Sequence, residues 1–184
     1  PLKDRIESQI LTHYPRSLDT ALAITEQEAA INDDQKQKVN VSDLVKRLIE
    51  QVAFEARGSE LVDKKSGVSA RLSISAYENA ISAAERRALI NNEKETQVWI
   101  SDLIGIIPSI TGKIELVYEG EQEGPYQVAF NLLERSIRTQ FGLYFPNPDT
   151  LKKKRGKEAV PDDNPYRSIT RWFDSGNTLN IFFE

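Results

Sequence analysis

The stretch VSDLVKRLIEQVAFEARG, residues 41–58, decides the fold class of this 184-residue chain. Its apolar residues recur at the i, i+3, i+4, i+7 spacing of one helix face. They are Val41, Leu44, Val45, Leu48, Ile49, Val52 and Ala53. Ser42 can cap the start of a helix here, and Gly58 is a residue type that often follows a helix end. The pattern predicts an amphipathic helix over residues 42–57.

Other segments repeat this helical spacing, so the chain as a whole is predicted to be mainly α-helical. Further helices are predicted over residues 18–30, 70–91 and 125–142, and residues 166–173 form a short amphipathic segment. Ser101 or Asp102 can cap one more short helix, which Pro108 limits.

The remaining segments predict minor strands and polar loops. Extended structure is predicted over residues 6–14 and 97–100, where β-prone residues gather. Residues 32–38 and 145–165 are rich in charged residues, Pro or Gly and are predicted to be loops. Residues 111–124 are predicted to be irregular or β-like.

The composition fits one or two globular units. The chain is 39% hydrophobic and 28% charged, with a formal net charge of −4. This mild acidity gives no general attraction to nucleic acid or anionic membranes. No apolar run reaches the roughly 18 residues that a membrane span needs, so we expect a cytoplasmic protein without membrane contact. The chain begins at Pro1 and contains no methionine, and we therefore expect a fragment of a longer protein.

A self-contained catalytic site is not expected from these residues. His13 is the single histidine and there is no cysteine, so a zinc site is not predicted and His13 is read as structural. The phosphate-binding motif G-x-x-x-x-G-K-[ST] is absent, and the chain alone is expected to be inactive toward nucleotides. Three glutamates (Glu119, Glu121 and Glu123) are read as solvated rather than as a metal site.

Two arginines stand out by position. Arg5 precedes the predicted strand, and Arg71 lies at the head of the helix predicted over 70–91. A helix N-terminus carries partial positive charge, so a cation there is unfavourable unless an anion faces it. The plain reading of each arginine is a surface salt bridge.

The surrounding motifs resemble the AAA+ ATPases of the magnesium chelatase subunit I and MoxR-like group. PLKDRI (1–6) resembles the segment that closes the ATPase core. SGVSARLSISAYENAISAAERRAL (66–89) resembles the start of the third lid helix, and VWISDL (98–103) resembles the V-x-x-x-D element that starts the closing lid helix. Residues 112–141 and YFPNP (144–148) resemble the C-terminal extension of a bacterial branch of this group.

The resemblance implies a fold, a domain division and two site residues. The expected fold is a helical AAA+ lid-type bundle with a short N-terminal strand from the ATPase core and a helical C-terminal extension. The expected parts are the end of the core (1–15), the lid (16–108) and the extension (109–184). Arg5 would be the catalytic arginine finger that reaches a neighbouring subunit, and Arg71 would be the sensor-2 residue that binds the γ-phosphate of ATP. No metal ligand is expected.

The resemblance also implies partners and cofactors of the longer protein. That protein would bind ATP and Mg²⁺, which this chain alone would not, and would self-associate into a ring. A von Willebrand A-domain protein would be its partner, and ATP hydrolysis would drive remodelling of a partner or metal insertion. One competing reading is a helical protein-interaction module with no nucleotide role. Another is a nucleic-acid-binding domain led by the basic residues 151–157, although we do not expect nucleic acid to be a partner.

Overall fold

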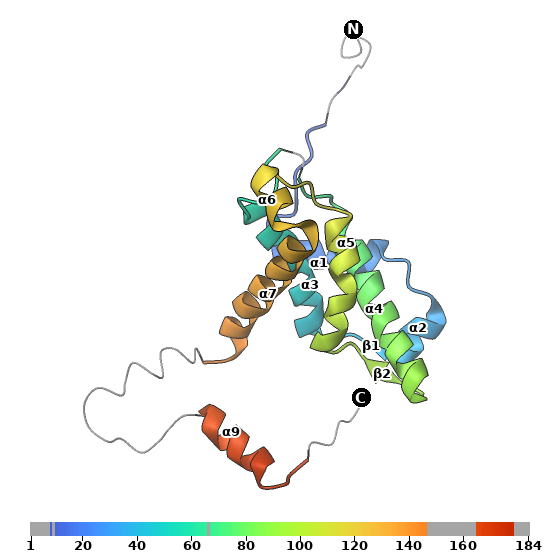
Figure 1. Cartoon of the computed structure of the whole chain (residues 1–184). Coiled ribbons are helices and arrows are strands. Elements are labelled where there is room, and N and C mark those ends of the chain that lie inside the picture. The colour runs from blue at the N-terminus through green and yellow to red at the C-terminus, as the bar shows by residue number, and fades with distance from the viewer. Residues whose placement is uncertain (1–7, 9, 66, 147–164, 179–184) are drawn as a thin grey trace, which may run out of the picture. The chain divides into compact units, whose positions relative to one another are not determined.

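The computed structural model describes residues 8, 10–65, 67–146 and 165–178, shown in colour in Figure 1. Most of these residues are helical, and the described strands are two short segments, so the prediction of a mainly α fold is confirmed. The chain divides into two compact units, Pro1–Tyr144 and Phe145–Glu184.

The first unit is a bundle of helices with one minimal sheet. Its helices are α1 (Leu18–Glu28), α2 (Asp33–Lys38), α3 (Asp43–Gly58), α4 (Leu72–Asn91), the 3₁₀-helix η2 (Ile100–Ile106), α5 (Ile107–Thr111), α6 (Tyr118–Glu123) and α7 (Pro125–Tyr144). Strands β1 (Val39–Asn40) and β2 (Thr96–Gln97) pair in parallel, with Val39 opposite Thr96 and Asn40 opposite Gln97.

Helix α3 is central to this unit, as its sequence predicts. Figure 1 shows it between α7 and α4, and it also packs on α1. Ser42 caps it by accepting a hydrogen bond from the Val45 backbone amide at 3.4 Å, and the helix ends at Gly58. Because neighbours cover it on more than one side, burial extends beyond the predicted apolar face to Glu50 and Ala56.

Helix α4 packs closely on η2 through small residues on both elements. A Cβ atom added to Gly105 of η2 would lie only 2.8 Å from the Ala83 Cβ. A further face of α4 carries Ala76, Ala80, Ala84 and Ala88, which are buried at intervals of four residues.

Two segments predicted to be irregular are helical instead. Residues 33–38 form α2 because Asn32 and Gln35 make a reciprocal capping box, with acids in the first turn and lysines in the last. The acidic residues Glu119, Glu121 and Glu123 lie on α6, where the first two face the positive end of the helix dipole. The β-like reading holds for the residues just before α6, where Val62 pairs with Leu116 and Val68 with Ile114 in isolated bridges.

Other predicted boundaries also need correction. Pro108 does not limit a helix but lies in the first turn of α5, where its missing amide costs no hydrogen bond. The predicted cap residues Ser101 and Asp102 lie inside η2, whose N-cap is Trp99. Extended structure over 97–100 shrinks to Thr96–Gln97. In the described part of 6–14, no residue has strand pairing, because no described strand lies beside it to supply hydrogen bonds.

The compact units differ from the domain boundaries expected from the resemblance. Helix α5 crosses the expected boundary between residues 108 and 109, and α7 packs on α3, so residues 16–144 belong to one compact unit. The assignment of 1–15, 16–108 and 109–184 to an ATPase core, a lid and an extension stays a prediction.

The second unit contains helix α9 (Pro165–Asp174) within its described part. The short amphipathic segment identified over residues 166–173 is therefore helical. Ile169, Trp172 and Phe173 are all about half exposed, and the Trp172 and Phe173 rings meet edge to face with centroids 5.0 Å apart. The basic stretch 151–157 lies outside the described residues.

Candidate functional site

Arg71 is the N-cap residue of α4, and its side chain is exposed. Within the described part of the chain, its guanidinium has neither a hydrogen bond nor an ion pair, so the plain reading as a local salt bridge does not apply to it. By contrast, Arg47, Arg87 and Arg138 all bind carboxylates. Arg5 lies outside the described residues.

The backbone that carries Arg71 is held firmly. The Ser69 amide donates to the Lys113 carbonyl at 2.8 Å, and the Leu72 amide donates to the Ser69 carbonyl at 3.1 Å. The Tyr14 hydroxyl donates to the Val68 carbonyl. Leu72 is fully buried, next to a guanidinium that is not. The arrangement is a fixed turn that presents a cation with no partner among the described residues.

The turn leading into this segment requires glycine at position 67. A Cβ atom on Gly67 would lie 2.1 Å from the Asp63 carbonyl oxygen, far inside van der Waals contact. The Gly67 amide donates to that same carbonyl at 3.0 Å. The absent side chain therefore lets the backbone close this turn.

Glu50, on α3, is a buried carboxylate, and helix α4, which packs on α3, has no acidic residue in its own first turn. The Glu50 Oε1 atom has no hydrogen-bond partner among the described residues. Burial raises the pKa of Glu50 above its ordinary value, while the Thr25 and Ser73 hydroxyls and the positive charge of Arg57 oppose that rise.

Arg57, on the same helix as Glu50, is half-buried between two aromatic rings. Its Cζ lies 4.3 Å from the Tyr14 ring centroid and 5.3 Å from that of Phe54, within the range of cation–π attraction. Its Nε and Nη1 atoms are buried without a hydrogen-bond partner among the described residues. Burial lowers the pKa of Arg57, while Tyr14 and Glu50 oppose that shift.

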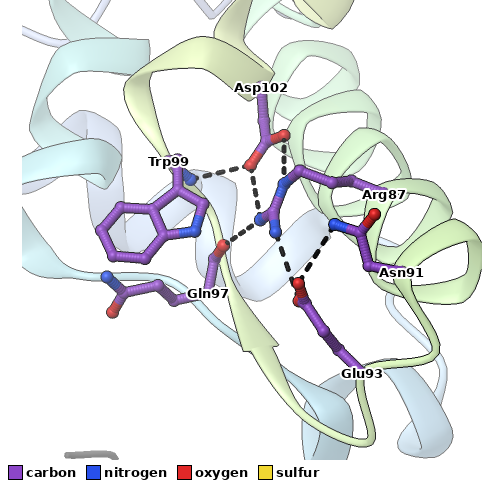
Figure 2. Close-up of polar contacts among 6 residues, drawn as sticks. All are labelled: Arg87, Asn91, Glu93, Gln97, Trp99 and Asp102. Carbon is purple, nitrogen blue, oxygen red and sulfur yellow. Dashed lines mark hydrogen bonds and ion pairs between the residues drawn. The ribbon is translucent and has the colours of Figure 1, made fainter. Parts of the chain in front are cut away.

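A second polar cluster joins α4 to β2 and η2, and Figure 2 shows its six residues. Arg87 donates two hydrogen bonds to the buried Asp102 carboxylate, from Nε to Oδ1 and from Nη2 to Oδ2, both 3.0 Å long. Arg87 also donates to the Gln97 carbonyl at 2.8 Å and to Glu93 at 3.3 Å. The Asp102 hydrogen bond is the largest cause of the raised pKa of Arg87.

This cluster gives a structural reason for the spacing in VWISDL. Val98 is buried, and Asp102, four residues later, accepts a hydrogen bond from the Trp99 amide at 2.8 Å while it binds Arg87. Asp102 thus fixes the start of η2 and ties it to α4. Because most donors of Arg87 are already engaged, this cluster is structural rather than a free ligand site.

A groove of about 490 Å³ lies beside this cluster. It is lined by Ala83, Arg86, Arg87, Ile90, Ser101, Asp102 and Gly105. A smaller one of about 260 Å³ is lined by residues of α6, α7 and the loop after α3, including Arg135 and Arg138. Neither groove has Arg71 among its lining residues.

The described residues include no group of three or more His, Asp or Glu side chains that could hold a metal ion. His13 is exposed, and its Nδ1 donates to the Tyr14 carbonyl at 2.8 Å. None of the described helices combines the length and apolarity needed to cross a membrane.

Sequence reasoning missed Glu50, Arg57 and Tyr14. One signal was available: Glu50, Ala53 and Arg57 are spaced to share a face of the helix predicted over 42–57. When an acidic and a basic residue share a helix face with a small apolar residue, their side chains can be buried polar groups. Tyr14 offered no such signal, because its partners lie more than 40 residues away.

Comparisons of the chain with protein-family models, with curated proteins and with solved structures found no match. The resemblance to the AAA+ group, and the roles that it implies for Arg5 and Arg71, stay predictions.

Proposed function

We propose that this chain is the lid and C-terminal extension of a magnesium-chelatase-like AAA+ ATPase, in which Arg71 binds the terminal phosphate of ATP. One observation carries the proposal: the turn before α4 is held by hydrogen bonds on both sides, while the Arg71 guanidinium has no partner among the described residues. A polyanion at this position would offset the unfavourable placement of a cation at a helix N-terminus, which costs about 0.3–1 kcal/mol.

The chemistry of phosphoryl transfer suits this residue type. Negative charge spreads over the γ-phosphate oxygens in the transition state. A guanidinium is permanently charged and offers forked donors that can bind two of those oxygens at once. Since α4 packs on α3, η2 and α5, a pull on Arg71 would be transmitted to the helices of the first unit.

The other parts of the proposal rest on the resemblance alone. Arg5 would serve as the arginine finger toward a neighbouring subunit in a ring. ATP and Mg²⁺ would be held by a phosphate-binding loop and acidic residues in a preceding part of a longer protein. The partner would be a von Willebrand A-domain protein, and the work would be remodelling or metal insertion in the cytoplasm.

The first test is the sequence that precedes Pro1 in the gene, where the proposal requires a phosphate-binding loop and its acidic partner. A gene with no such loop would contradict it. The second test is steady-state ATP turnover of the longer protein with Arg71→Ala. Loss of one preorganised donor to the transition state is expected to lower kcat by roughly 10²-fold.

Arg86→Ala is the matched control for that experiment. Arg86 is also exposed and also on α4, but it lies in the fourth turn rather than at the N-cap. We expect turnover close to that of the unchanged protein. Unchanged turnover in both Arg71→Ala and Arg5→Ala would favour the competing reading.

That competing reading is a helical protein-interaction module, and one observation favours it. Ile90 lines the groove between α4 and η2, and Ile100 and Ile104 of η2 are also more than half exposed. A nucleic-acid role would instead show as retention on DNA that falls steeply with salt.

A further inference from the structure

Helix α3 carries two charged residues, Glu50 and Arg57, whose burial disfavours folding because they do not form an ion pair with each other. Glu50 is 3% exposed and Arg57 is half-buried, and no ion pair joins them. They are seven residues apart, roughly 10 Å along the helix axis. Glu50 Oε1 and Arg57 Nε and Nη1 are buried without hydrogen-bond partners among the described residues. Buried charges of this kind are expensive, and apolar residues of similar size are often as stable or more so.

One of these two side chains, Arg57, reaches the turn that presents Arg71. Its guanidinium lies over the ring of Tyr14, whose hydroxyl donates a hydrogen bond to the carbonyl of Val68, three residues before Arg71. Through Tyr14, helix α3 is therefore linked to the backbone just before Arg71, whose own guanidinium has no partner among the described residues.

We propose that Tyr14 is a positioning residue for Arg71, which holds the start of α4 so that the guanidinium meets its anion in one geometry. Tyr14 itself does not touch the anion. Because the position of Arg71 matters for activity only if Arg71 binds nucleotide, the proposal rests on the proposed function. Arg57 supports Tyr14 by lying over its ring, so the cost of burying the Arg57 charge is offset by a gain in position rather than in stability.

The structural half of this proposal can be tested on the 184-residue chain. Tyr14→Phe keeps the ring over Arg57 and removes only the hydroxyl that holds Val68. Amide hydrogen exchange is then measured at Leu72 and Ser75, whose amides donate to Ser69 and Arg71. We expect exchange roughly fivefold faster at both amides, the effect of losing one hydrogen bond.

Tyr126→Phe is the matched control, because the Tyr126 hydroxyl is exposed and has no hydrogen bond to any described residue. Its exchange at Leu72 and Ser75 is expected to equal that of the unchanged chain. Equal exchange in Tyr14→Phe and Tyr126→Phe would overturn the proposal.

The functional half is tested by a double-mutant cycle on the longer protein. Tyr14→Phe is expected to raise KM for ATP roughly fivefold, with a smaller effect on kcat. This effect should vanish when Arg71 is already alanine, because Tyr14 acts through Arg71. An effect that persists unchanged in the Arg71→Ala background would overturn the proposal, since it would report general destabilisation.

The two failures can be told apart. If Arg71→Ala itself leaves turnover unchanged, the proposed function fails. If Arg71→Ala lowers turnover but Tyr14→Phe does not change KM, only the positioning role of Tyr14 fails. Tyr126→Phe is again the control for Tyr14→Phe.

Discussion

The Tyr14 hydroxyl donates a hydrogen bond to the backbone carbonyl of Val68, 54 residues later in the chain. This bond ties the segment before α1 to the turn before α4. The Tyr14 ring also covers the Arg57 guanidinium, so the same side chain joins three parts of the first unit. Residues that follow the predicted finger segment are thereby linked to the turn that presents Arg71.

The Arg87–Asp102 pair is predicted to be the most costly polar contact to break. Arg87→Met leaves the 6%-exposed Asp102 side chain without its cation. We expect a loss of about 3 kcal/mol in the free energy of unfolding, measured by urea denaturation. Arg138→Met is the control, because the Arg138–Glu134 bridge is solvent-exposed and is expected to contribute less than about 1 kcal/mol. Equal losses in the two variants would contradict this account.

Glu50 is predicted to make stability fall as pH rises. Because burial raises its pKa in the folded state, the folded chain binds a proton more tightly than the unfolded chain does. Stability from this group is therefore full below its ordinary pKa and is lost as pH rises through the raised pKa.

Glu50→Gln removes this dependence. Relative to the unchanged chain, the variant should gain about 1.4 kcal/mol for each pH unit between the ordinary and the raised pKa. The measurement is urea unfolding of both proteins from pH 4 to pH 8, so that other titrating groups cancel in the difference. A difference that does not change with pH would contradict the prediction.

Gly67 and Gly58 are predicted to respond oppositely to alanine. At Gly67 the new Cβ would collide with the Asp63 carbonyl, and we expect a loss of about 2 kcal/mol or more. At Gly58, the last residue of α3, nothing lies within 4 Å, and alanine should stabilise the helix by up to about 1 kcal/mol. Thermal unfolding of the two variants checks both signs, and a tolerated Gly67→Ala would refute the tight turn.

The close contact of α4 and η2 predicts a compensating pair. Gly105→Ala places a methyl group 2.8 Å from the Ala83 Cβ and should destabilise the chain by roughly 1–3 kcal/mol. Ala83→Gly should cost about 1 kcal/mol through helix propensity alone. The double variant should be more stable than the sum of the two predicts, because the glycine makes room for the methyl. Simple additivity in denaturant unfolding would show that the two residues are not in contact.

Some errors in reading the sequence share one cause. The segment 32–38 was predicted to be a loop from its polarity, but its capping box and charge order favour a short helix. Pro108 is predicted to end a short helix, although proline fits the first turn of a helix as well as it ends one. In both cases a local rule allowed two outcomes. In the described part of 6–14 the prediction is wrong for a different reason, since a strand exists only where another strand pairs with it.

The sequence by itself determined that the chain is mainly helical and where its long helices run. Apolar spacing and caps act within a few residues, so α1, α3, α4 and α7 could all be predicted from local pattern. Only the tertiary structure decided which polar groups meet. Arg57 with Tyr14, Tyr14 with Val68, and Arg87 with Asp102 are pairs whose partners lie 15 to 54 residues apart, so no local spacing encodes them. Packing of the helices sets the direction and burial of those side chains, and with it the freedom of Arg71.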